Sequence, residues 1–168
     1  MPRPRTPKLP KEKTLISEVL QRVSNAKTKD KKVEILREYD TMALQKVLLC
    51  NYSYNIKFVF PEGRSPYNKP EEGEEKPIGY DHTWLISEHR QIDKFCKRAV
   101  CNQVYYGDSG MPNPSIPQLR KEQLWVQLLE NLHPDEAEVL DLVKDKKLQT
   151  RYKITKQNVK DAFPALDI

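Results

Sequence analysis

The sequence has little glycine, few cysteines and no long apolar run. Only 5 of its 168 residues are glycine, and neither Gly-x-Gly-x-x-Gly nor Gly-Lys-Ser/Thr occurs, which argues against a dinucleotide or P-loop nucleotide site. The 3 cysteines, an odd number, provide no disulfide framework, so we expect reduced thiols. No run approaches the ~20 apolar residues that span a bilayer, and the N-terminus has no apolar signal core. We therefore expect a protein that stays in a cytoplasm and has no membrane partner.

The positive charge is concentrated at the start of the chain. The net charge is +5, from 29 basic and 24 acidic residues. Residues 1–13 hold five of the basic residues and one glutamate, so 24 basic and 23 acidic residues remain and the body is almost neutral. Prolines at positions 2, 4, 7 and 10 favour an extended polyproline II leader. This leader is either a solvated extension or an arm that attracts phosphate groups through Arg3, Arg5, Lys8, Lys11 and Lys13.

The strongest structural pattern lies between residues 119 and 163. Leucines at 124, 128 and 132, with Trp125 beside them, form an apolar helical stripe. Pro134 suits the first turn of a new helix, and the acidic residues after it match the positive end of the helix dipole. Thr155 has the position of an N-cap. These signals predict two helices that meet at a corner, followed by a short last helix.

The first half of the chain has shorter patterns. Thr14 and Asp40 have the positions of N-caps, and the apolar spacing predicts three short helices before a strand-like alternation over residues 51–60. A proline-rich acidic loop of about twenty residues follows at 61–80, a length that is uncommon inside a small domain. Asp81 is the expected start of a helix that runs to about Val100. Residues 105–117 are again irregular and rich in glycine and proline.

We predict an all-α fold, a small helical domain of about six or seven short helices with one extended segment and proline-rich loops. The expected organisation is a flexible leader at 1–13, a helical lobe at 14–60, the acidic loop at 61–80 and a second helical lobe at 81–168. The two lobes form either a single domain or two small units that separate near the loop.

The residues that most often carry chemistry are poorly arranged for it. His82, His89 and Cys96 are seven residues apart, which on a helix is about 10 Å per step, too far to share one zinc ion at about 2.0–2.3 Å. We interpret the thiols as core residues and the histidines as surface or hydrogen-bonded groups. The acidic residues at 71–75 and 135–138 fit a solvated loop and a helix start. We predict no catalytic residue, no metal and no cofactor, and hence no enzyme.

A basic cluster near the C-terminus is the second candidate for contact with nucleic acid. It lies at a helix end and across the turn into the last helix, where two short helices can present phosphate contacts. Lysines at a helix C-terminus are also expected from the helix dipole alone. Both interpretations remain open for Lys144, Lys146, Lys147, Arg151 and Lys153, with Lys156 next to them.

Several blocks of the sequence, in this order, resemble a family of short proteins of T4-like bacteriophages, notably marine cyanophages. They are KDKKVEILREY at 29–39, FPEGRSPYN at 60–68, LLENLHPDEA at 128–137, KDKKL at 144–148, ITK at 154–156 and AFP at 162–164. The resemblance implies a phage origin and a place in the infected bacterial cytoplasm or in the virion. It brings no activity and no functional residues with it.

The charge pattern and the resemblance together lead to one functional expectation and two alternatives. We expect a non-enzymatic phage accessory protein that docks a phage or host protein, or a nucleoprotein, with non-specific DNA or RNA contact through the basic leader. The alternatives are a virion component of the neck, tail or capsid, and a host-takeover protein that binds a bacterial enzyme.

Overall fold

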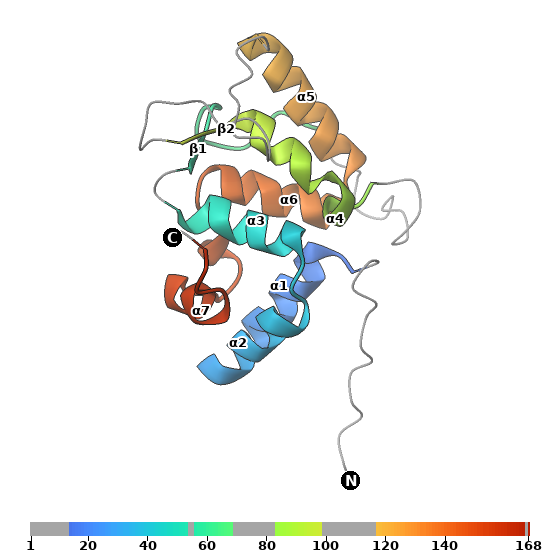
Figure 1. The fold of residues 1–168 in the computed structure, drawn as a ribbon. Helices are drawn as coiled ribbons and strands as arrows, with labels where there is room; N and C mark the ends of the chain where they lie inside the picture. Colours follow the sequence, from blue (N-terminus) through green and yellow to red (C-terminus); the bar gives the residue numbers. More distant parts are fainter. Residues whose placement is uncertain (1–13, 54–55, 69–82, 99–116, 167) are drawn as a thin grey trace.

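The structure is a computed structural model that describes residues 14–53, 56–68, 83–98, 117–166 and 168. The predicted leader, the acidic run at 71–75 and the irregular segment at 105–116 lie outside these residues. The helices of the described residues are α1 (Ile16–Asn25), α2 (Lys29–Glu38), α3 (Met42–Tyr52), α4 (Leu85–Glu88), α5 (Gln118–Asn131), α6 (Pro134–Lys144) and α7 (Lys156–Ala162), together with the 3₁₀ helices η2 (His89–Phe95) and η4 (Leu148–Thr150). The predicted all-α fold is confirmed (Figure 1).

The extended segment is shorter than predicted, and it has a partner. Helix α3 continues to Tyr52, so the strand β1 covers only Ile56–Phe58. It pairs antiparallel with β2 (Cys96–Arg98), with Phe58 opposite Cys96. This pairing overturns the prediction of one helix from Asp81 to Val100, because the last residues of that range form backbone hydrogen bonds with a strand about forty residues earlier.

The N-terminal signals of the helices are partly as predicted. Thr155 caps α7 with a reciprocal capping box that includes Asn158, and Pro134 is the first residue of α6, both as predicted. Thr41 caps α3 in place of Asp40. Helix α1 begins after Leu15 without a side-chain cap from its own turn, so Thr14 is not its N-cap.

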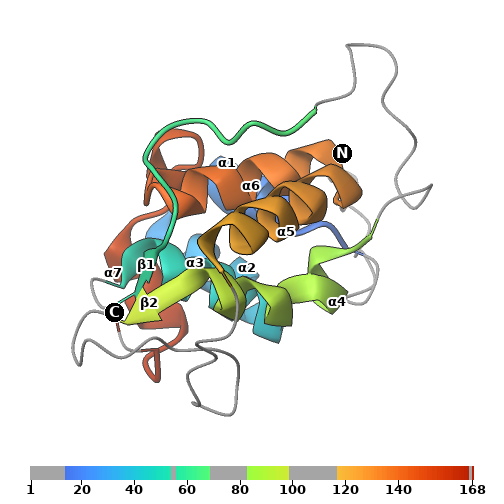
Figure 2. The same ribbon diagram turned by 90° about the horizontal axis from the view of Figure 1, so that it is seen from above.

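Helix α6 lies at the centre of the hydrophobic core. Its Val139, Leu140 and Val143 are fully buried, and it packs against α1, α3 and α5 (Figures 1 and 2). The core is one continuous cluster that contains residues from both 14–60 and 81–168. At one end of the molecule in Figure 1 lie α5, β1 and β2, and at the other end lie α2 and α7, which pack against each other.

A buried carboxylate joins α6 to two other helices. Glu136 has no exposed surface, and its Oε2 accepts a hydrogen bond from the backbone N–H of Ile16 at 2.9 Å. Its Oε1 accepts one from the N–H of Leu85 at 3.1 Å. Since Ile16 and Leu85 are the first residues of α1 and α4, one side chain satisfies an unpaired N–H at the start of each helix. This contact replaces the missing side-chain caps of both helices.

Candidate functional site

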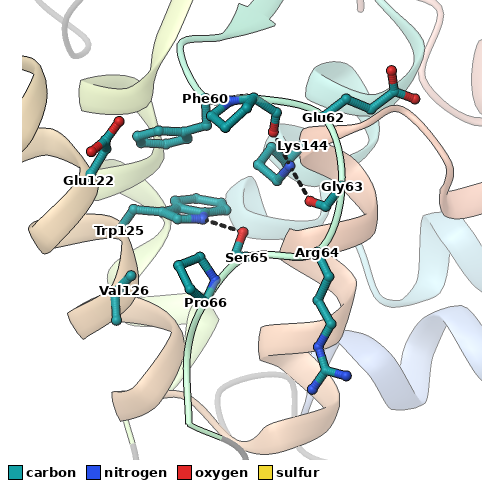
Figure 3. Close-up of a pocket in the computed structure, with 11 residues that line it drawn as sticks. Phe60, Glu62, Gly63, Arg64, Ser65, Pro66, Glu122, Trp125, Val126 and Lys144 are labelled. Carbon is teal, nitrogen blue, oxygen red and sulfur yellow. Dashed lines mark hydrogen bonds between the residues drawn. The ribbon is translucent and has the colours of Figure 1, made fainter.

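Residues 60–66 cross the outer faces of α5 and α6 and enclose a pocket (Figure 3). Its base is aromatic. The ring of Trp125, on α5, lies 5.2 Å from that of Phe60 and 5.2 Å from that of Phe95, measured between centroids, and Phe58 adds a contact at 5.6 Å. Trp125 is almost completely buried. Four aromatic rings from three separate segments therefore form a rigid apolar cluster beneath the pocket.

Ser65 attaches the crossing segment to both helices. The indole N–H of Trp125 donates to Ser65 Oγ at 3.0 Å. The same hydroxyl donates to Asp141 Oδ1 on α6 at 2.6 Å, and the backbone N–H of Ser65 donates to that oxygen at 3.1 Å. A buried hydroxyl that both donates and accepts has a fixed orientation, so this wall of the pocket is held in place.

Lys144 fixes the other end of the segment. Its ammonium group is buried at the end of α6 and donates to the carbonyl oxygens of Pro61 at 2.8 Å and Gly63 at 2.7 Å, and to the Asp145 carboxylate at 2.8 Å. All three ammonium hydrogens thus have an acceptor. Gly63 has φ +107°, a backbone conformation that favours glycine, and its N–H donates to Asp145 Oδ2.

The pocket is small and mostly apolar. Its volume is about 230 Å³, smaller than the about 300–1,000 Å³ of small-molecule and cofactor sites. Phe60, Pro66, Trp125 and Val126 make its walls apolar, Glu122 lies at its exposed edge, and the side chain of Arg64 extends away from the cavity (Figure 3). No histidine or cysteine is among its lining residues. A single bulky side chain of a partner fits these dimensions and this chemistry.

A family model matches residues 19–150 of the chain. The chain belongs to DUF6433, a family of unknown function. No curated protein and no solved structure matches it. The DUF6433 match includes every residue that lines the pocket, whereas the leader and α7 lie outside the matched range.

The lysines at the end of α6 of this DUF6433 chain are part of its internal structure. Lys144 holds the pocket wall, as described above. Lys146, which has φ +58°, donates to the carbonyl oxygens of Cys50 and Ser53 at 2.7 Å each, at the C-terminal end of α3. Burial lowers the pKa of Lys146. These two ammonium groups bind backbone carbonyls, as cations do at the C-terminal ends of helices.

The remaining members of the predicted basic cluster point in different directions. Lys147 pairs with Glu62 at 3.0 Å, and Arg151 pairs with Glu138. Lys153 is exposed and lies beside α1 and α2. The five cluster residues are therefore not gathered on one surface. The leader residues Arg3, Arg5, Lys8, Lys11 and Lys13 lie outside the described residues, and their predicted role stays a prediction.

The described part of the chain contains no group of three or more His, Cys, Asp or Glu residues that could hold a metal ion. His82 lies outside it. His89 Nδ1 donates to the carbonyl oxygen of Ile86 at 2.9 Å, and the Cys96 thiol donates to that of Ile92 at 3.4 Å. Cys50 and Cys96 are both buried and reduced. Among the described helices, none has the length and apolar character to cross a bilayer.

The sequence did not reveal the pocket. Its key hydrogen bond joins Ser65 and Trp125, which are 60 positions apart. The one local signal was the density of aromatic residues at 58–60, which we had interpreted as part of a strand.

Proposed function

We propose that this protein is a non-enzymatic accessory protein that docks a protein or nucleoprotein partner through the pocket above Trp125. The observation that carries the proposal is a cavity whose walls are fixed before any partner arrives. Ser65 and Lys144 hold the crossing segment at two points, so the free energy of ordering that segment is part of folding and not of binding.

The character of the pocket indicates the kind of partner. An apolar recess with charged residues at its edge is typical of an interface that captures one anchoring side chain and surrounds it with polar contacts. Glu122 lies at this edge, and the exposed Glu62 and Arg64 belong to the segment that forms the opposite wall. We therefore expect a partner protein that inserts one leucine, phenylalanine or similar side chain. The resemblance to phage proteins supports a phage or host protein in the infected bacterial cell, or a neighbour in the virion.

The nucleic-acid part of the proposal rests on the leader. Its five basic residues on an almost neutral body supply non-specific attraction for phosphate groups. If DNA and RNA fragments fail to bind the protein at low salt, or bind equally well after removal of residues 1–13, this part of the proposal is wrong.

Affinity capture from infected cells tests the docking function, with a variant whose pocket is filled. Val126→Trp adds a large ring to the cavity wall, whereas Gln127→Trp adds the same ring to the next, exposed residue of α5, which does not line the pocket. We expect one dominant protein to be recovered with the unchanged protein and with Gln127→Trp after nuclease treatment, and to be lost with Val126→Trp. Retention by Val126→Trp would show that the partner binds elsewhere.

A further inference from the structure

Lysines from two distant parts of the sequence meet at the junction of α1 and α2. The backbone N–H of Lys153 donates to Ser24 Oγ at 3.0 Å, and the ammonium group of Lys32 donates to the carbonyl oxygen of Lys153. These contacts place Lys153 between the last turn of α1 and the first turn of α2. The sequence had grouped Lys153 with Lys144 and Lys147, but in space its neighbours are the lysines of α2.

Helices α2 and α7 run in the same direction, which brings further lysines to this end. Lys32, near the start of α2, contacts the segment before α7, whereas Arg37, near the end of α2, donates to the carbonyl oxygens of Asp161 and Ala162 at the end of α7. The first residues of both helices are therefore at one end of the molecule. The α2–α7 lysine surface comprises Lys27, Lys29, Lys31, Lys32, Lys153 and Lys156.

Positive charge dominates the two segments that form this surface. Segments 24–32 and 153–156 contain six lysines, and Asp30 is their only acidic residue. Four of the six lysine side chains, at 27, 29, 31 and 153, are exposed. Lys144 and Lys146, by contrast, are bonded to backbone carbonyls inside the molecule. The α2–α7 end thus carries a concentration of exposed positive charge on the described body.

We propose that the α2–α7 lysine surface binds the phosphate backbone of nucleic acid without reading its sequence. Lysine is a flexible point charge, which suits phosphate contacts and carries no base recognition by itself. A membrane surface is the other large polyanion, but a membrane-binding surface combines lysines with exposed apolar residues. The exposed large apolar residues of the described chain are Met42 and Leu119, and neither belongs to this surface.

The inference deepens the nucleic-acid part of the proposed function and does not depend on the pocket. It assigns to the folded body a share of the binding that charge counting gave to the leader alone. The two contributions differ in the residues that carry them, so substitutions separate them in the full chain.

The test measures how the binding of a labelled DNA duplex of about 20 base pairs depends on salt between about 50 and about 200 mM. The variant Lys29→Gln/Lys31→Gln/Lys153→Gln removes three exposed charges of the surface. Each lysine that contacts a phosphate contributes about 1 to the slope of log K against log salt, so the slope should become shallower by about 3. The single variant Lys31→Gln should make this slope shallower by about 1. It keeps the test decisive if the triple variant fails to fold.

A matched control removes three exposed charges away from this surface and outside the pocket, in Lys57→Gln/Arg90→Gln/Arg120→Gln. It should keep the original slope. A fourth variant changes the five basic leader residues to Gln. It should still bind the duplex, with an affinity that falls as the salt concentration rises. The proposal is wrong if the α2–α7 variant binds like the unchanged protein, if the control loses as much, or if the surface binds phosphatidylserine vesicles but no duplex.

Discussion

Replacement of Glu136 by Gln probes the buried carboxylate that joins α6 to the starts of α1 and α4. Burial raises the pKa of Glu136 from 4.5 to about 7, against the hydrogen bonds from the N–H groups of Ile16 and Leu85, which lower it. The negative charges of Asp135 and Glu18 raise it further. The carboxylate therefore has two good donors but too little solvation, and its ionised form costs free energy in the folded state.

The sign and the size of the effect follow from these pKa values. The folded state holds the proton of Glu136 up to about pH 7, whereas the unfolded chain releases it near pH 4.5. The stability that comes from this proton is complete below about pH 4.5 and is lost as the pH rises to about 7. The difference between the two pKa values corresponds to about 3 kcal/mol of unfolding free energy. Glutamine cannot ionise, so Glu136→Gln escapes this loss.

Urea denaturation from pH 4.5 to pH 8 measures the prediction, with both proteins at each pH. Glutamine places an amide N–H₂ where one oxygen accepts a hydrogen bond, which destabilises the variant by about 1–3 kcal/mol at every pH. Relative to the unchanged protein, the variant should then gain about 3 kcal/mol between the lowest and the highest pH. Glu34→Gln, on the exposed face of α2, is the control for a change from glutamate to glutamine. If the unfolding free energies of Glu136→Gln and the unchanged protein change with pH by the same amount, the reasoning is wrong.

Two further predictions concern Ser65, which fixes the pocket wall, and the two lysines that follow α6. Ser65→Ala leaves the indole N–H of Trp125 without its acceptor and should lower the unfolding free energy by about 1–3 kcal/mol in urea denaturation. Unchanged stability would contradict the role given to the Ser65 hydroxyl. Lys146→Met removes two charged hydrogen bonds to the end of α3 and should destabilise by about 2 kcal/mol in thermal unfolding, whereas Lys147→Met, at an exposed ion pair, should have no measurable effect. Equal effects of the two lysine substitutions would contradict their different placement.

The features that were predictable from the sequence depend on residues close to one another along the chain. Pro134 marks the start of α6, and Thr155 with Asn158 caps α7, because each signal acts within about one helical turn. The apolar stripe of α5 is likewise predictable from the helical spacing within the helix itself. Trp125, Leu128 and Leu129 are buried, as this spacing indicates. Local rules therefore recover the corner between α5 and α6, which supports the core.

The features that were not predictable depend on partners far away in the chain. The apolar spacing of residues 85–96 fits a helix, but β2 takes Cys96 into a ladder with Phe58, and no local pattern announces that pairing. The pocket has the same origin, since Ser65 needs both Asp141 and Trp125 to become a fixed wall. The capping of α1 by Glu136 spans 120 positions.

The basic residues illustrate why charge counts over a folded chain can mislead. The body after the leader is almost neutral in sum, so the net charge by itself supports a polyanionic partner only for the leader. A sum ignores which charges are used inside the fold. Lys144 and Lys146 bond to carbonyls, and Lys147 and Arg151 pair with glutamates, so their charges are compensated or held locally. The exposed lysines of α2, with Lys153, concentrate positive charge at one place on a nearly neutral body, and the proposed contact with a nucleic-acid backbone depends on that local field and not on the total.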